Sequence, residues 1–335
     1  LCNFIRKPVD GIEQRSRSNK VGGFVRVFVS SRETPYDTEK IAQSQMAEIT
    51  CDEKWEISGE VKKLTVEHKM AAERLGFKKL FDALDNVSSY KQGLREGSLS
   101  AIGVFTHILL PLHKADLENN PFEKAKIVKE NAVVYKNKDF ILTNESLNNL
   151  QNSIDSLSLC WKDKDPLCNE ILQIIYEHNI FPISKDLQKL LENPPVEGDA
   201  DYQKLCGLSA ALEAPFSEIE RYWEYINGNA SFDTHQGVKG LEFERVMVII
   251  DEKSPQGTMF NYEKFFGIMP KSPTDLKNES EGKETTLDRT RRLLYVTCSR
   301  AIDSLAIVFY TDCVDKTASA LSQTSWFSEN EIIVI

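Results

Sequence analysis

The chain has 335 residues, of which 41% are hydrophobic and 27% are charged, and its formal net charge is −10. This composition is typical of an ordinary soluble globular protein, and this length predicts about two domains. No apolar run approaches the ~20 residues that a membrane span needs, so we expect no membrane contact. The acidic balance excludes a protein that binds nucleic acid mainly through its overall field, so any such contact must be local, in a groove.

The seven cysteines are scattered along the chain and form no C-x-x-C pair. This pattern predicts neither a zinc site nor a disulfide framework, so we expect no bound metal and a reducing, cytoplasmic location. The sequence begins LCNFIRKPVDG, without an initiator Met and without the apolar stretch of a signal peptide. We expect from this that the chain starts partway through a longer protein.

The first part of the chain, residues 1–98, alternates between strand and helix patterns. Alternating β-rich runs predict strands, and apolar residues at helical spacing predict helices. Strand followed by helix, when repeated, predicts a parallel sheet and therefore an α/β fold. The expected elements are a helix at 1–7 that ends at Pro8, a strand at 24–31, a helix at 36–49, a strand at 62–68 that ends in His68, and a helix at 70–87.

The middle of the chain, residues 99–228, has a different pattern. Its apolar residues recur at helical spacing with few alternating β-branched runs, which predicts an inserted all-helical subdomain. From 229 to 335 the α/β pattern returns and completes the sheet. The elements expected there are a buried strand at 245–251, a long polar loop at 252–283, a helix at 286–301, and strands at 304–311 and 328–335.

A first chemical motif is the segment THQGVKGLEF at 234–243, just before a predicted buried strand. Its glycines permit positive φ and let the backbone approach a ligand closely. Backbone N–H groups in such a loop can face phosphate oxygens, and a nearby carboxylate can accept a ribose hydroxyl. The alternative is a tight loop that only feeds a core strand. The residues by themselves leave these two interpretations open.

A second motif is RTRRLLYVTCSRA at 289–301, on a predicted helix. From 283 to 300 there are five Lys or Arg and two acids, a local excess of +3 in an acidic chain. Arg300 ends this helix just before an apolar strand, where a guanidinium could reach a phosphate in a cleft. The alternative is a cation placed favourably at a helix C-terminus.

The two motifs together resemble motifs V and VI of UvrD/Rep-type superfamily 1 DNA helicases, in their order and in their spacing of about fifty residues. The resemblance extends over nearly the whole chain but is specific only at 232–250 and 288–310. It implies a RecA-like domain with an inserted helical subdomain. It also implies roles for single residues: Arg300 as the catalytic arginine that reaches the γ-phosphate, Glu242 at the ribose, Gly240 and Lys239 in the nucleotide-binding loop, and Thr234 and His235 at DNA.

The sequence contains no G-x-x-x-x-G-K-[ST] loop and no D-E-x-Q box, which P-loop enzymes need to hold phosphates and Mg²⁺. We therefore expect the C-terminal part of an ATP-dependent 3′–5′ helicase or translocase that is inactive as an ATPase alone. ATP and Mg²⁺ would bind the full-length protein, and neither is expected on this chain by itself. The implied partners are single-stranded and duplex DNA, the missing N-terminal RecA-like domain, and further protein subunits.

Two alternatives remain at this stage. The chain could be a non-enzymatic DNA- or protein-binding module with a degenerate RecA-like fold. It could also belong to a split enzyme in which another chain brings the phosphate loop. The retained Arg300 and Glu242 argue against a pure binding module, because binding alone does not require both.

Overall fold

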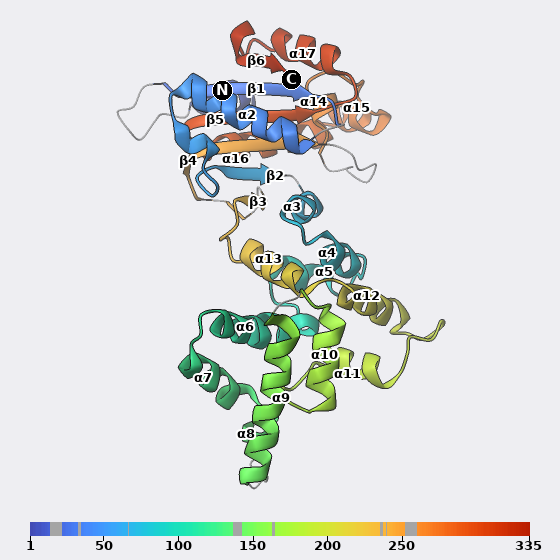
Figure 1. The fold of residues 1–335 in the computed structure, drawn as a ribbon. Helices are drawn as coiled ribbons and strands as arrows, with labels where there is room; N and C mark the ends of the chain where they lie inside the picture. The colour runs from blue at the N-terminus through green and yellow to red at the C-terminus, as the bar shows by residue number, and fades with distance from the viewer. Residues whose placement is uncertain are drawn as a thin grey trace. The chain divides into compact units, whose positions relative to one another are not determined.

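The computed structural model describes residues 1–13, 22–32, 35–65, 67–136, 143–162, 165–234, 237–238, 240–251 and 260–335. The chain divides into two compact units (Figure 1). The first joins Leu1–His68 with Ser231–Ile335, and the second is Lys69–Ala230. None of the helices in the described ranges combines the length and the apolar character needed to cross a membrane.

The first unit is built on a sheet of parallel strands in the order β3-β2-β4-β5-β1-β6. This confirms the predicted α/β class and the parallel sheet, an arrangement consistent with a RecA-like fold. The long strands β4 and β5 are buried along most of their length, so their sequences are nearly continuous apolar runs. The strands are β1 (Phe24–Ser30), β2 (Lys62–Thr65), β3 (Phe232–Thr234), β4 (Phe243–Asp251), β5 (Ala301–Tyr310) and β6 (Ile332–Val334).

Helices cover both faces of this sheet, and alternate strand residues point to each face. On one face, Val27, Val246 and Leu305 share a core with side chains from four helices. On the other face, Trp55 Nε1 donates to Ser304 Oγ at 3.0 Å, and helix α2 packs against β1 and β5. The helices of the first face are α1 (Cys2–Asp10), α14 (Tyr262–Phe265), α16 (Thr286–Cys298) and α17 (Val314–Gln323); α2 (Pro35–Thr50) and the 3₁₀ turn η1 (Glu53–Glu56) belong to the second.

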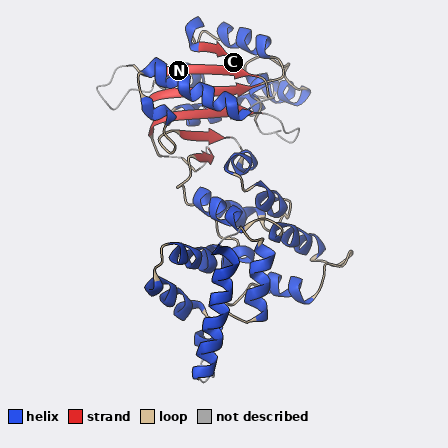
Figure 2. Cartoon of the chain, in the orientation of Figure 1, coloured by secondary structure: helices blue, strands red, loops and turns tan. Residues whose placement is uncertain are grey.

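The second unit is helical, and its described residues form no strand longer than an isolated bridge (Figure 2). Aromatic side chains fill its core: Phe77 packs against Phe81, Tyr222 and Tyr225, and Trp161 stacks on Phe216. Its elements are α3 (His68–Leu75), α4 (Lys78–Asp85), α5 (Lys91–Glu96), η2 (Ser100–Ile102), the π-helical η3 (Phe105–Leu109), α6 (Leu110–Leu117), α7 (Pro121–Asn131), α8 (Val133–Lys136), α9 (Asn144–Lys162), α10 (Cys168–Glu177), α11 (Lys185–Glu192), α12 (Tyr202–Leu212) and α13 (Phe216–Ile226).

The helical unit begins earlier in the chain than 99, because α3, α4 and α5 pack within it. Helix α4 lies against α12 and α13, and the Leu80 amide donates to Glu218 Oε2 at 2.9 Å. The unit ends at Ala230, close to the expected end at 228. The sequence pattern of 70–87 was that of a helix, but it could not tell which neighbours that helix would contact.

Several local predictions were wrong. The expected helix at 70–87 is interrupted at Gly76, which has φ +77°. The strand at 62–68 ends at Thr65, and His68 opens α3. Pro8 does not end α1, which continues to Asp10 and is closed by Gly11 at φ 67° with its N–H bonded to the Lys7 carbonyl.

The expected polar loop at 252–283 contains two short helices, α14 and α15 (Pro273–Ser280). Residues 252–259 lie outside the described residues. Each helix starts at a capping side chain that accepts from the chain: Asn261 accepts from the Lys264 amide, and Ser272 accepts from the Asp275 amide. These caps allow polar segments with little helical periodicity to form short helices.

Candidate functional site

The two sequence motifs meet at the amino edge of the sheet, where β4 and β5 begin. Glu242 directly precedes β4, Arg300 directly precedes β5, and Phe243 pairs with Ala301 in the register of these strands. The Phe243 amide donates to the Arg300 carbonyl at 2.8 Å. Because the strands are parallel, both motifs must deliver these residues to the same edge. The proximity of Glu242 and Arg300 in the chain fold thus follows from the strand pairing.

The Arg300 side chain turns back on its own surroundings. Its Nε donates to the Val296 carbonyl at 3.0 Å and its Nη1 to the Leu241 carbonyl at 2.9 Å. Its Nη2 donates to Ser299 Oγ, also at 2.9 Å. Among the described residues, then, the direct partners of Arg300 are neutral oxygens and none is a carboxylate. Arg300 is only partly exposed, yet no acid of the described residues contacts its guanidinium directly.

The loop before β4 offers an accessible carboxylate. Glu242 is exposed, as are its neighbours Leu241 and Gly240. Gly240 has φ +83°. Residues with a Cβ are strained in this conformation, so the position favours glycine. Lys239, the fourth residue assigned to the nucleotide by resemblance, lies outside the described residues.

Thr234, assigned to DNA by resemblance, lies near the opposite end of the sheet. It ends β3 beside Thr65, which in turn pairs with Ile249 of β4. Six residue steps separate Phe243 from Ile249, which is about 20 Å at ~3.3 Å per residue. The structure therefore does not bring Thr234 close to Glu242 and Arg300. Thr234 is also buried, with 4% of its surface exposed, and His235 lies outside the described residues.

Two residues near this segment were missed by the sequence analysis. Asp233 Oδ1 accepts from the Thr234 amide at 2.8 Å, and its Oδ2 pairs with Lys62 Nζ at 3.4 Å. A Cβ built on Gly237 would lie 2.2 Å from Asp233 Oδ1, so the loop backbone passes directly over this carboxylate. An aspartate just before a loop that contains glycine is a signal for such a local bond. Lys62 gave no signal, because its contact depends on the strand register.

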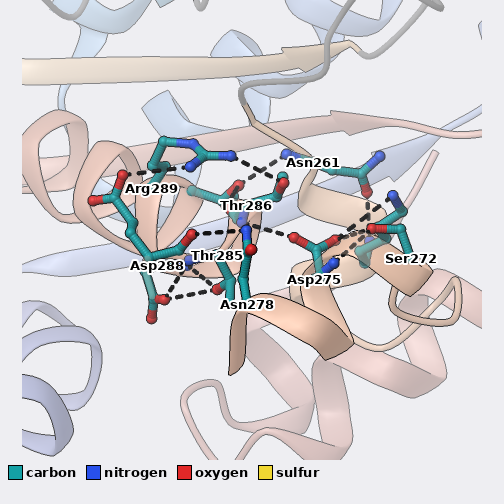
Figure 3. A network of polar contacts seen from close by, with 11 residues as sticks. Asn261, Ser272, Asp275, Asn278, Thr285, Thr286, Asp288 and Arg289 are labelled. Atoms are coloured by element: carbon teal, nitrogen blue, oxygen red, sulfur yellow. Dashed lines mark hydrogen bonds and ion pairs between the residues drawn. The ribbon is translucent and has the colours of Figure 1, made fainter. Parts of the chain in front are cut away.

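A polar network fixes the N-terminus of α16, the helix that carries the second motif (Figure 3). Thr285 and Asp288 form a reciprocal capping box, and Asp275 Oδ1 accepts from the Thr286 amide at 2.9 Å. Thr290 Oγ1 accepts from the Asn261 amide at 2.8 Å, which ties α16 to α14. These contacts leave few N-terminal amides of α16 without an acceptor.

Electrostatics within this network favour an ionised Asp275. Burial alone would raise the pKa of its carboxyl, but hydrogen bonds from Ser272 and from Thr286 outweigh that cost and lower the pKa from 3.8 to about 2. Further along α16, Tyr295 accepts a hydrogen bond from Arg6 of α1 at 2.9 Å. Tyr295 therefore joins two helices, which is a packing role.

The described residues contain no group of three or more His, Cys, Asp or Glu side chains that could hold a metal ion. The amino edge itself presents a cation, Arg300, and a carboxylate, Glu242. Such a pair can bind the phosphate and hydroxyl groups of a nucleotide.

The chain shows a distant sequence similarity to a curated protein. The chain matches no protein-family model. Among curated proteins it is similar to the Gabija protein GajB of Bacillus cereus (strain HuB5-5), with 25% identity over 284 residues. The match covers 75% of this chain and 40% of GajB, so the chain spans less than half the length of this relative.

Proposed function

We propose that this chain is the C-terminal part of an ATP-dependent DNA helicase or translocase of the UvrD/Rep type. The observation that carries the proposal is the position of Arg300. Its guanidinium lies at the amino edge of the sheet, bonded to the carbonyl next to Glu242, with only neutral direct partners among the described residues. A phosphate could replace those oxygens at low cost, because none of these three contacts is an ion pair.

Arg300 would act on the transferred phosphoryl group. A guanidinium held against the γ-phosphate stabilises the charge that develops in the transition state, and such arginines contribute about 10³–10⁵-fold to the rate. The exposed Glu242 would accept a hydrogen bond from the ribose, and the loop at Gly240 and Lys239 would close around the nucleotide. Mg²⁺ and the phosphate-binding loop would come from the N-terminal RecA-like domain of the parent protein.

DNA would bind where the chain leaves β3, at Thr234 and His235, and not at the amino edge where Glu242 and Arg300 lie. Because Thr234 is buried, it would support this contact rather than present its hydroxyl to a phosphate. His235 remains the proposed direct contact, since an imidazole can donate to a backbone phosphate. Movement in the 3′–5′ direction, contact of the helical unit with DNA and a cytoplasmic location are part of the same proposal.

The test is an activity measurement on the full-length parent protein and on this chain alone. We expect ATP hydrolysis by the parent that single-stranded DNA stimulates, and unwinding of duplexes with a 3′ tail in preference to a 5′ tail. This chain alone should hydrolyse no ATP, because it has no G-x-x-x-x-G-K-[ST] loop. ATP hydrolysis by the isolated chain would contradict the proposal.

A parent protein that binds DNA but hydrolyses no ATP would support the other reading, a binding module with a degenerate fold. The split-enzyme alternative would show itself in a different way. Hydrolysis would then appear only when a second protein that carries the phosphate loop is added.

A further inference from the structure

The two ends of the segment between Thr234 and Phe243 are joined by a lysine that neither motif contains. Lys62 lies on β2, between β3 and β4 in the sheet. Its Nζ is 3.4 Å from Asp233 Oδ2 and 5.6 Å from the centroid of the Phe243 ring. The lysine thus makes an ion pair just before one end of the segment and a cation–π contact at the other.

The ion pair is shielded from water, which makes it stronger than a surface pair. The side chains of Lys62 and Asp233 are 10% and 14% exposed. Salt and water screen such a pair much less than an exposed one. Lys62 therefore links Asp233, near the carboxyl end of β3, to Phe243, at the amino end of β4.

The contacts continue in both directions from Lys62. Asp233 accepts from the Thr234 amide at 2.8 Å, and the Phe243 amide donates to the Arg300 carbonyl at 2.8 Å. A chain of described contacts therefore leads from Thr234 through Asp233, Lys62 and Phe243 to Arg300. This chain of contacts spans the distance of ~20 Å along the strands between Thr234 and the amino edge of the sheet.

We propose that Lys62 and Asp233 are positioning residues that couple the DNA end of this segment to Arg300. The effect of this coupling on ATP hydrolysis rests on the proposed function, whereas the linkage of Asp233 and Phe243 through Lys62 does not. A shift of Thr234 on DNA binding would move the Asp233 carboxylate, and the charge of Lys62 would transmit that movement to Phe243. Loss of the lysine would leave both ends intact and disconnect them.

Lys63 provides a matched control on the same strand. It points to the opposite face, where its Nζ is 3.4 Å from Glu39 Oε2 and 5.2 Å from the centroid of the Phe232 ring. Its side chain is 16% exposed, so it has nearly the same burial, ion pair and cation–π contact as Lys62. It contacts neither Asp233 nor Phe243 among the described interactions. Lys63→Met should thus reproduce the stability cost of Lys62→Met without the loss of coupling.

The experiment measures the ATPase rate of the full-length parent against the concentration of single-stranded DNA. Lys62→Met should lower the DNA-stimulated kcat by about tenfold, a coupling of ~1.4 kcal/mol, while the KM for ATP changes less than about twofold. Asp233→Asn should have a similar effect, and the double variant should be no worse than either single one. Lys62→Arg keeps the charge and the cation–π contact and should restore most of the stimulation. An equal loss in Lys63→Met, or no rescue by Lys62→Arg, would overturn the proposal.

A second measurement separates this proposal from the proposed function. Hydrogen exchange of the peptide that spans 232–243 should become faster in Lys62→Met and remain unchanged in Lys63→Met, whatever the protein catalyses. If the unmodified parent shows no DNA-stimulated ATPase, the proposed function fails and this exchange experiment decides the role of Lys62. Unchanged exchange in Lys62→Met would show that the lysine does not hold the segment, and the inference would be wrong.

Discussion

Arg32 and Arg300 lie at opposite edges of the same parallel sheet and bind different kinds of partner. Arg32 follows β1 at the carboxyl edge and contacts three acids: Asp251 at 3.2 Å, Glu263 at 3.6 Å and Asp312 at 2.5 Å. Arg300 precedes β5 at the amino edge and contacts neutral oxygens in the described part of the chain. Both arginines are partly buried.

The difference indicates that Arg32 stabilises the fold through ion pairs, whereas Arg300 is the arginine that a ligand could reach more easily. The charge of Arg32 neutralises Asp251 and Glu263, whose carboxylates are 5% and 17% exposed and would be costly to bury without a cation, so a ligand could take this arginine only by breaking ion pairs. In the described ranges of the chain, no such counter-ion contacts Arg300 directly. Ligands of open α/β sheets usually bind at the carboxyl edge. Beside β1 that edge carries the ion pairs of Arg32, whereas Arg300 lies at the amino edge.

The largest expected effect is the loss of activity on substitution of Arg300. Arg300→Ala in the full-length parent should lower the DNA-stimulated ATPase rate by about three orders of magnitude, because the phosphoryl group loses its cation. The free energy of unfolding should change by less than ~1 kcal/mol, since the lost bonds are to partly exposed neutral oxygens. ATPase assays and thermal unfolding of the same samples measure both. A small rate change with a large loss of stability would make Arg300 a structural residue like Arg32.

The second effect is on stability and concerns Arg32. Arg32→Ala should destabilise the chain by about 3 kcal/mol, because Asp251, only 5% exposed, loses its charged partner. Asp312→Ala is the control within the same cluster: Asp312 is 80% exposed, and its loss should cost less than ~1 kcal/mol. Chemical denaturation measures both. Equal costs for the two variants would mean that burial does not determine the strength of this cluster.

The third effect is a pH dependence of stability that comes from Asp275, which caps the N-terminal end of α16. Its pKa is about 2 in the folded chain against 3.8 for the free group, so its contribution to stability is present above about pH 4. This contribution, ~2 kcal/mol, is lost as the pH falls from about 4 to 2. The stability difference between the unmodified chain and Asp275→Asn should therefore shrink over this range. Thermal unfolding at several pH values tests it, and a difference that is constant with pH would contradict the assignment.

The sequence could predict the meeting of Glu242 and Arg300, because each directly precedes an apolar strand and parallel strands begin at one edge. It could not predict that Thr234 lies near the other end, since that depends on the pairing of β3 with β2. The same register brings Lys62 to Asp233, a contact for which the sequence gives no spacing rule. The helices α14 and α15 were also missed, because capping side chains rather than apolar periodicity define them.

The smallest effect tests whether the two ends of α16 act independently. Thr285→Ala removes the side chain that accepts from the Asp288 amide at 3.2 Å, and loss of such a cap should cost about 1 kcal/mol of stability. Thr285→Ser keeps the hydroxyl and should cost much less. The ATPase rate of the parent should stay within about twofold in both variants, because Arg300 is held at the other end of the helix by Leu241 and Ser299. If instead the rate falls with the cap, the N-terminal network sets the position of Arg300, and the helix transmits strain from its structural end to its chemical one.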